Sequence, residues 1–137
     1  MAMNMDGAPM WDQRYGATDD YVFGTEPAAF LARRVDVLEP ASRTLVVADG
    51  EGRNSVFLAE RGHQVTATDI SEVGVDKARR LAAERGVTVD FRIADITTWA
   101  WEPDAYDAVV AIFIQFLAPE QRAAAFALFA AAAFVHL

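Results

Sequence analysis

Residues 44–69 read TLVVADGEGRNSVFLAERGHQVTATD, and this stretch decides the fold class. It opens with a short, continuous apolar run over residues 44–48, which is typical of a strand buried on both faces of a sheet. A turn containing glycines follows, and then a helical segment over residues 54–61 that Gly62 closes. Residues 64–68 (QVTAT) indicate a second strand. Because a strand, a helix and a strand follow one another at short intervals, we expect the two strands to be parallel.

The same alternation continues along the rest of the chain. The further elements that the pattern predicts are a helix from Pro27 to Leu38 that stops at Pro40, a helix capped by Ser71 that runs to Arg85 with Gly86 just after it, strands over residues 87–93 and 106–113, and a helix beginning at Pro119. This order predicts an α/β fold, a Rossmann-like parallel sheet with flanking helices. In open sheets of this kind, ligands bind beyond the carboxyl ends of the strands, where the strand order reverses.

Length and charge limit the number of domains and the class of partner. The 137 residues suit one domain, which we place at residues 11–137 after a flexible leader over residues 1–10. The 12 Lys and Arg residues against 20 Asp and Glu residues give a net charge of −8. Such an acidic surface repels phosphate backbones and anionic lipid headgroups, so nucleic acid and membranes are disfavoured as partners. We therefore expect a small-molecule or protein partner.

The cysteine content limits the kinds of metal site, and the apolar runs indicate where in the cell the protein is located. The chain has no cysteine, which excludes disulfides and thiolate metal sites, and no His or carboxylate spacing suggests another metal site. The N-terminus MAMNMDGAPM carries no Lys or Arg before an apolar run, so it does not resemble a signal peptide. The longest uncharged apolar stretch apart from one His, residues 123–137, is shorter than the roughly 18–20 residues that cross a bilayer. These features predict a soluble, cytoplasmic protein.

The turn after the first strand, residues 49–54 (DGEGRN), is the first candidate ligand site. Gly50 and Gly52 let the backbone approach a ligand closely, and the helix that follows presents free N–H groups to negative charge. The alternative is an ordinary tight turn between a strand and a helix. A dinucleotide-binding fingerprint needs a third glycine three residues after the second one. Ser55 occupies that position, which counts against NAD and favours a ligand without a pyrophosphate.

Carboxylates follow the second and third strands. Asp69 ends the second strand, where a carboxylate can accept hydrogen bonds from both hydroxyls of a ribose. The alternative is that Asp69 only caps the next helix, for which Ser71 is already a good cap. Asp95 and Ile96 follow the third strand, where a carboxylate can accept from the exocyclic amine of adenine and a backbone amide can donate to a ring nitrogen. A solvated loop aspartate is the alternative there.

Two stretches of the chain resemble one protein family. Residues 45–71, LVVADGEGRNSVFLAERGHQVTATDIS, resemble the core of class I S-adenosylmethionine-dependent methyltransferases, especially the branch with tellurite-resistance and thiopurine-type enzymes. In that branch a glycine-rich turn followed by Arg-Asn opens the first helix of the sheet, and an acid ends the second strand. Residues 11–31, WDQRYGATDDYVFGTEPAAFL, are similar to the W-D-x-R-Y and Y-x-F/Y-G-x-x-P-x-x-F-L patterns that precede this sheet. With the ADI and YDAVV segments, the resemblance covers nearly all of residues 11–117.

The resemblance implies S-adenosylmethionine as the cofactor and a set of residues around it. The implied cofactor-binding residues are Trp11, Arg14, Tyr15, Asp49, Gly50, Glu51, Gly52, Asn54, Asp69, Ile70, Asp95 and Ile96. In this assignment Gly50 and Gly52 pass under the methionine moiety, Asp69 holds the ribose, and residues 95–96 hold the adenine. Trp11, Arg14 and Tyr15, with Tyr21 and Gly24, fold over the cofactor as a lid. The alternative for these aromatic residues is a hydrophobic staple of the first helix against the sheet.

The sequence departs from the family pattern in the first strand and turn. Ala48 stands where the first glycine is usual, and Val46 stands where an acid is usual. Asp49 and Glu51 are the alternatives for supplying the missing charge near the sulfonium. Gln115 follows the fourth strand, where relatives often place groups that face the substrate. It is a candidate for lining the acceptor pocket, and a solvated loop residue is the alternative.

The function that these features predict is methyl transfer to a small-molecule acceptor of the thiol or chalcogen type. Such a transferase needs positioning and exclusion of water more than acid–base chemistry, which fits a chain in which no catalytic residue stands out. His63 and His136 are expected to be structural. A non-catalytic module that binds an adenosyl ligand or a partner is the alternative, and an NAD-dependent oxidoreductase is disfavoured by Ser55.

The C-terminal part of the chain is short for this fold. Methyltransferases of this class continue with a fifth strand, a further helix and an antiparallel hairpin, whereas this chain ends at Leu137, inside or just after the helix that follows the fourth strand. We therefore expect a sheet that lacks its last strands. An unpaired edge on the strand at 106–113 is a known route to association, so we expect a homodimer formed through that edge or the last helix.

Overall fold

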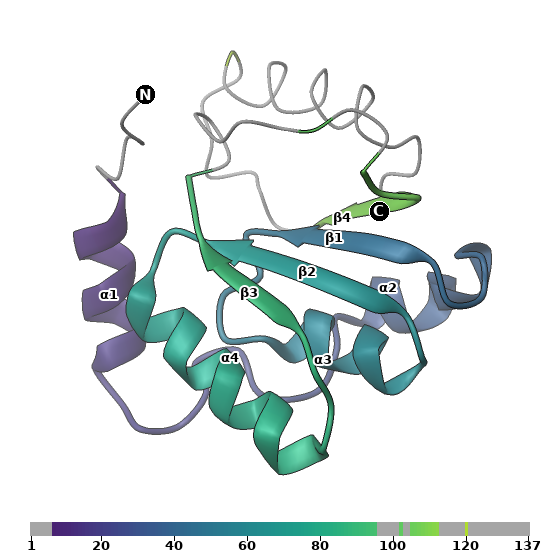
Figure 1. Cartoon of the computed structure of the whole chain (residues 1–137). Helices are drawn as coiled ribbons and strands as arrows, with labels where there is room; N and C mark the ends of the chain where they lie inside the picture. The colour runs from purple at the N-terminus through teal and green to yellow at the C-terminus, as the bar shows by residue number, and fades with distance from the viewer. Residues whose placement is uncertain (1–6, 96–101, 103–104, 113–119, 121–137) are drawn as a thin grey trace.

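The computed structural model describes residues 7–95, 102, 105–112 and 120. From β1 onward, strands alternate with helices along the chain up to β3, as the sequence predicts (Figure 1). The elements are α1 (Ala8–Gly16), α2 (Ala29–Arg34), a short 3-10 helix η1 (Val35–Val37), β1 (Arg43–Val47), α3 (Arg53–Glu60), β2 (Gln64–Asp69), α4 (Glu72–Arg85), β3 (Asp90–Ile93) and β4 (Ala108–Ala111).

The described strands form one parallel sheet in the order β3-β2-β1-β4. In the central pair Leu45 lies beside Thr66, and on the other side of β1 the same residue lies beside Val109. The chain moves outward from β1 to β2 and β3, and then returns to the opposite side of β1. The strand order therefore reverses at β1, and a ligand site is expected beyond the carboxyl end of this strand.

Helices α3 and α4 lie on the same face of the sheet, as right-handed crossover connections require (Figure 1). The core on this face joins residues of the three strands β1, β2 and β4 with residues of α2, η1 and α3. Its buried members are Ala28, Leu31, Val35, Leu38, Val46, Leu58, Val65, Ala67, Ala108 and Val110. Strand β1 is buried on both faces, since Leu45, Val46 and Val47 are each at most 1% exposed. This burial confirms the prediction made from the apolar run at 44–48.

Several element limits differ from those predicted. The helix expected from Pro27 begins at Ala29, because Ala28 is extended and donates its N–H to Asn54 Oδ1 at 2.8 Å. The strand expected from residue 87 begins at Asp90, because the N–H of Val87 is bound to Ala82 O at 3.0 Å in the termination of α4. Gly86 ends that helix in the left-handed conformation, as predicted.

Two further predicted segments lie near the ends of the chain. Helix α1 begins at Ala8, so the last residues of the expected leader over 1–10 are helical. The helix expected from Pro119 lies outside the described residues except for Glu120. Within the described part of the chain, no helix is long and apolar enough to span a membrane.

Candidate functional site

The turn between β1 and α3 has a backbone conformation that requires glycine. Gly52 has a φ of 92°, and a Cβ built on it would lie 2.7 Å from Ala78 Cβ and 2.8 Å from Ala78 Cα. The turn is therefore packed directly against the backbone of α4. Ala48, which stands at the usual first glycine of the family pattern, also has a positive φ of 51°. This conformation costs an alanine about 1–2 kcal/mol relative to the right-handed one. Val46, at the usual acid, lies in the core, 1% exposed.

Asp49 faces the start of α3. Its side chain accepts the N–H of Ser55 at 3.2 Å and the hydroxyl of Ser55 at 2.6 Å. Burial raises the pKa of Asp49 to about 7, and the hydrogen bonds to Ser55 oppose that shift. The carboxyl group thus ties the turn to the first turn of α3.

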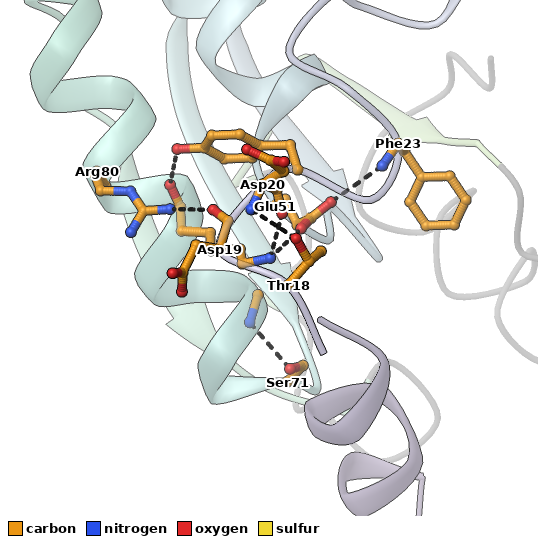
Figure 2. A network of polar contacts seen from close by, with 10 residues as sticks. Thr18, Asp19, Asp20, Phe23, Glu51, Ser71 and Arg80 are labelled. Atoms are coloured by element: carbon orange, nitrogen blue, oxygen red, sulfur yellow. Dashed lines mark hydrogen bonds and ion pairs between the residues drawn. The ribbon is translucent and has the colours of Figure 1, made fainter. Parts of the chain in front are cut away.

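Glu51 is buried and paired with a lysine of α4. Lys77 Nζ lies 2.9 Å from Glu51 Oε2, and both side chains are at most 7% exposed. The other oxygen, Oε1, accepts the N–H of Phe23 at 3.3 Å (Figure 2). The negative charge of Glu51 is therefore balanced inside the protein. Of the two acids considered for the missing charge near the sulfonium, one binds Ser55 and the other is paired with Lys77.

Asp69 joins the ends of the two central strands. Its Oδ1 accepts the N–H of Gly50 at 2.9 Å, and its Oδ2 accepts the N–H of Ser71 at 3.0 Å. Burial raises the pKa of Asp69 to about 6, although the two backbone hydrogen bonds lower it. The cap of α4 is Ser71, whose hydroxyl accepts the N–H of Gly74 at 3.0 Å. Since each carboxylate oxygen has further acceptor capacity, Asp69 can still bind ligand hydroxyls.

The aromatic N-terminal segment lies against this turn. Tyr15 is 5% exposed, and its ring would contact a Cβ on Gly74 at 3.1 Å, while its hydroxyl would lie 2.8 Å from a Cβ on Gly50. Burial raises the pKa of Tyr15 above its usual range. Trp11 stacks on Tyr15 with ring centroids 5.5 Å apart, and the Arg14 guanidinium lies 5.4 Å from the Trp11 ring. Three of the five predicted lid residues therefore come together, and Tyr15 contacts the turn and α4.

Two residues that the sequence reasoning did not single out connect this segment to α4. The hydroxyl of Ser71 donates to Asp12 Oδ1 at 2.6 Å, which fastens α1 to the start of α4. Lys77 donates to the carbonyl oxygen of Asp20 at 2.7 Å in addition to its pairing with Glu51. Asp12 belongs to the W-D-x-R-Y pattern, so the motif itself was a signal. Lys77 carried no such signal in the sequence.

The remaining candidates fall into three groups. Asn54 is engaged by the N–H of Ala28, as described above. Asp95 and Ile70 are half-buried, and the N–H of Ala94 donates to Asp69 O at 2.9 Å, so the end of β3 adjoins the end of β2. Ile96 and Gln115 lie outside the described residues.

The metal-ligating residue types and His63 are distributed as follows in the described part of the chain. Among the residues that the structure describes, no group of three or more His, Asp or Glu side chains is arranged to hold a metal ion. His63 lies just before β2, at the opposite end of the strand from Asp69, and its Nδ1 is 3.1 Å from the Ser42 hydroxyl. Burial lowers the pKa of His63.

Asp69 and the glycine turn lie at the edge of the sheet where ligands bind in open parallel sheets. Gly50, which packs closely against the Tyr15 hydroxyl, and the buried acceptor Asp69 lie together at the point where the strand order reverses. This parallel sheet, with its glycine turn and an acid ending the second strand, defines a class I S-adenosylmethionine-dependent methyltransferase fold. The chain belongs to the methyltransferase domain family, which matches residues 45–133. The resemblance inferred from the sequence is thereby confirmed.

Curated relatives extend beyond this chain. An uncharacterized protein of Mycobacterium tuberculosis is 26% identical over 134 residues, which cover 90% of this chain and 49% of the relative. A ubiquinone biosynthesis O-methyltransferase of Xanthomonas campestris pv. campestris is 38% identical over 81 residues, covering 58% of this chain and 33% of that enzyme. The chain thus spans about half the length, or less, of the curated relatives it matches.

Solved structures share the fold. A TehB-like SAM-dependent methyltransferase from Corynebacterium glutamicum is 22% identical with a TM-score of 0.66, covering 95% of this chain and 68% of that one. TehB from Haemophilus influenzae is 18% identical with a TM-score of 0.72, covering 90% and 42%. Magnesium protoporphyrin IX methyltransferase from Synechocystis PCC 6803, with bound SAM, is 26% identical with a TM-score of 0.63, covering 77% and 50%.

Proposed function

We propose that this chain binds S-adenosylmethionine beyond the carboxyl ends of β1 and β2 and transfers its methyl group to a small-molecule acceptor. The observation that carries the proposal is the position of Asp69. Its two carboxylate oxygens are held by the N–H groups of Gly50 and Ser71, so the side chain is preorganised for the two hydroxyls of a ribose. The family and the SAM-bound relative from Synechocystis support the choice of cofactor.

The other residues follow from this placement. We assign Gly50 and Gly52 to the methionine side of the cofactor, and residues 95–96 to the adenine. Trp11, Arg14 and Tyr15 form the lid, and this assignment is supported by the contact of Tyr15 with the glycine turn. Glu51 is paired with the charged Lys77, whereas Asp69 accepts neutral backbone N–H groups, so we assign the ligand hydroxyls to Asp69.

The acceptor that we propose is a thiol or a chalcogen species. When bound, the cofactor supplies a methyl group on a sulfonium. The acceptor lone pair forms the new bond to the methyl carbon, and the electrons of the broken S–C bond stay on sulfur, so the leaving group departs neutral. Little proton transfer is needed for such a soft acceptor, and the work left to the protein is positioning and exclusion of water. Gln115 is the residue that we assign to the acceptor side.

A second candidate is a module that binds the adenosyl ligand without catalysis. The conformation of Ala48 favours it, because a methyl group on a left-handed residue stands where the family pattern has a glycine. We further propose a cytoplasmic homodimer without nucleic-acid or membrane partners. The net charge of −8 and the place of β4 at the end of the described sheet support these assignments.

The test is calorimetric titration of S-adenosylhomocysteine into the purified chain. We expect micromolar binding that Asp69→Ala abolishes, whereas Asp76→Ala, on the exposed side of α4, leaves it unchanged. A folded chain that gives no binding heat, or equal binding by Asp69→Ala, would refute the proposed site. Methyl transfer to a panel of thiols and chalcogen oxyanions then separates the enzyme from the binding module.

A further inference from the structure

Lys77 is buried where three parts of the chain meet. Its side chain is 7% exposed, and its ammonium group lies 2.9 Å from Glu51 Oε2 in the glycine turn and 2.7 Å from the carbonyl oxygen of Asp20. Figure 2 shows Asp20, Phe23 and Glu51 gathered beside α4. Lysine is almost never fully buried unless it is paired, so the position of this side chain depends on these two acceptors.

Residues 18–24, named here the N-terminal strap, have no helix or strand of their own. The strap is held from outside by several hydrogen bonds besides the one to Asp20. The Tyr21 hydroxyl donates to Lys77 O at 3.1 Å, and the Phe23 N–H donates to Glu51 Oε1 at 3.3 Å. At its exposed side, Arg80 donates to Asp19 O at 3.2 Å. Glu51 therefore binds Lys77 with one oxygen and the strap with the other.

We propose that Lys77 is a positioning residue that fixes the N-terminal strap against the glycine turn before the cofactor binds. This inference rests on the proposed function, because Tyr21 and Gly24 of the strap belong to the predicted lid. A lid that is already ordered in the free protein does not have to be ordered on binding, which raises affinity. Lys77 makes no contact that requires the cofactor, so its effect is indirect.

The competing explanation is that Lys77 only neutralises Glu51. Lys77→Met alone does not separate the two, because it leaves a buried carboxylate without its partner and destabilises the fold. The double variant Lys77→Met/Glu51→Gln removes both charges and keeps an acceptor for the Phe23 N–H. If neutralisation is the whole role, the double variant restores wild-type behaviour. If Lys77 positions the strap, the double variant folds but the strap stays loose.

Hydrogen exchange in the ligand-free chain measures how well the backbone amides of the strap are protected. In the double variant we expect the amide of Gly24, which donates to Tyr21 O inside the strap, to exchange at least about tenfold faster, because the strap loses the charge-assisted hydrogen bond from Lys77 to Asp20 O. The amides of Leu45 and Val46 in β1 should stay protected, which establishes that the chain is folded. Arg79→Met is the matched control, since Arg79 lies on the same helix and pairs with the exposed Asp76.

The affinity for S-adenosylhomocysteine gives the second readout. We expect it to fall about tenfold in the double variant and to stay unchanged in Arg79→Met. Wild-type exchange at Gly24 in the folded double variant would overturn the proposal, and so would faster exchange with unchanged affinity. If the wild-type chain does not bind the ligand at all, the proposed function fails, and the exchange rates still decide whether Lys77 holds the strap.

Discussion

Substitution of Gly52 by alanine tests the packing of the glycine turn on α4. The residue has a φ of 92°, and the left-handed conformation costs a non-glycine residue about 1–2 kcal/mol. The new Cβ would also lie 2.7 Å from Ala78 Cβ and 2.8 Å from its Cα. Relief requires a shift of the helix backbone, and overpacking of this kind costs about 1–3 kcal/mol more. We therefore expect Gly52→Ala to lower the free energy of unfolding by about 2–5 kcal/mol.

Gly62→Ala is the matched control for this experiment. Gly62 has nearly the same φ, 91°, but no atom lies within 4 Å of a Cβ built on it. Both substitutions reduce the conformational entropy of the unfolded chain equally, so this contribution cancels between them. The difference between the two variants isolates the contact with Ala78 and should be about 1–3 kcal/mol.

Urea denaturation followed by circular dichroism measures both free energies of unfolding, provided the m-value is unchanged. Equal losses in Gly52→Ala and Gly62→Ala would refute the reasoning, because they would mean that α4 does not pack on the turn as described. A larger loss in Gly62→Ala would refute it equally.

Three further predictions concern the same turn. The pKa of Asp49 is about 7 in the folded chain against an ordinary 3.8, so between these pH values the folded state binds a proton that the unfolded state does not. The free energy of unfolding should therefore fall as pH rises from about 4 to about 7. Asp49→Asn should flatten this dependence in urea titrations at several pH values. Gly74→Ala would stabilise an ordinary helix by about 1 kcal/mol. Here it should instead lower the thermal midpoint, because the new Cβ would lie 3.0 Å from Gly50 O and 3.1 Å from the Tyr15 ring. A higher midpoint would contradict these contacts. Ala48→Gly should raise the free energy of unfolding by about 0.5–1 kcal/mol in urea titrations, since relief of the positive φ outweighs the added entropy of the unfolded chain. An unchanged or lower free energy of unfolding would contradict this reasoning.

The elements of the sheet were predictable because burial leaves a local pattern. The apolar run at 44–48 predicted β1, and the structure places this strand at Arg43–Val47. The difference at Ala48 is conformational, because its apolar side chain continues the run while its backbone already turns with a φ of 51°. The third strand was predicted too long for a related reason. An alternating pattern at 87–93 does not register that the N–H of Val87 is used by the end of α4.

Single residues of the candidate site could be placed from the sequence, but pairs of residues that are distant in sequence could not. Asp69 and the glycines follow strands directly, so their place in the fold was implied by strand order. The partners of the acids were not, since Glu51 pairs with Lys77, 26 residues away, and Ser71 with Asp12, 59 residues away. A local pattern contains no information on which distant charge neutralises a buried one, and this neutralisation decides which acid remains for a ligand.

The sheet order has a consequence for the synthesis of this protein. Strand β1 pairs on one side with β2, which follows soon after it, but on the other side Thr44 pairs with Ala108. At translation rates of about 5–20 residues per second, the second neighbour of β1 leaves the ribosome roughly 3–13 s after β1 itself. During that interval one edge of this buried strand lacks the neighbour that it has in the folded sheet, so an apolar edge of the nascent chain is exposed to association.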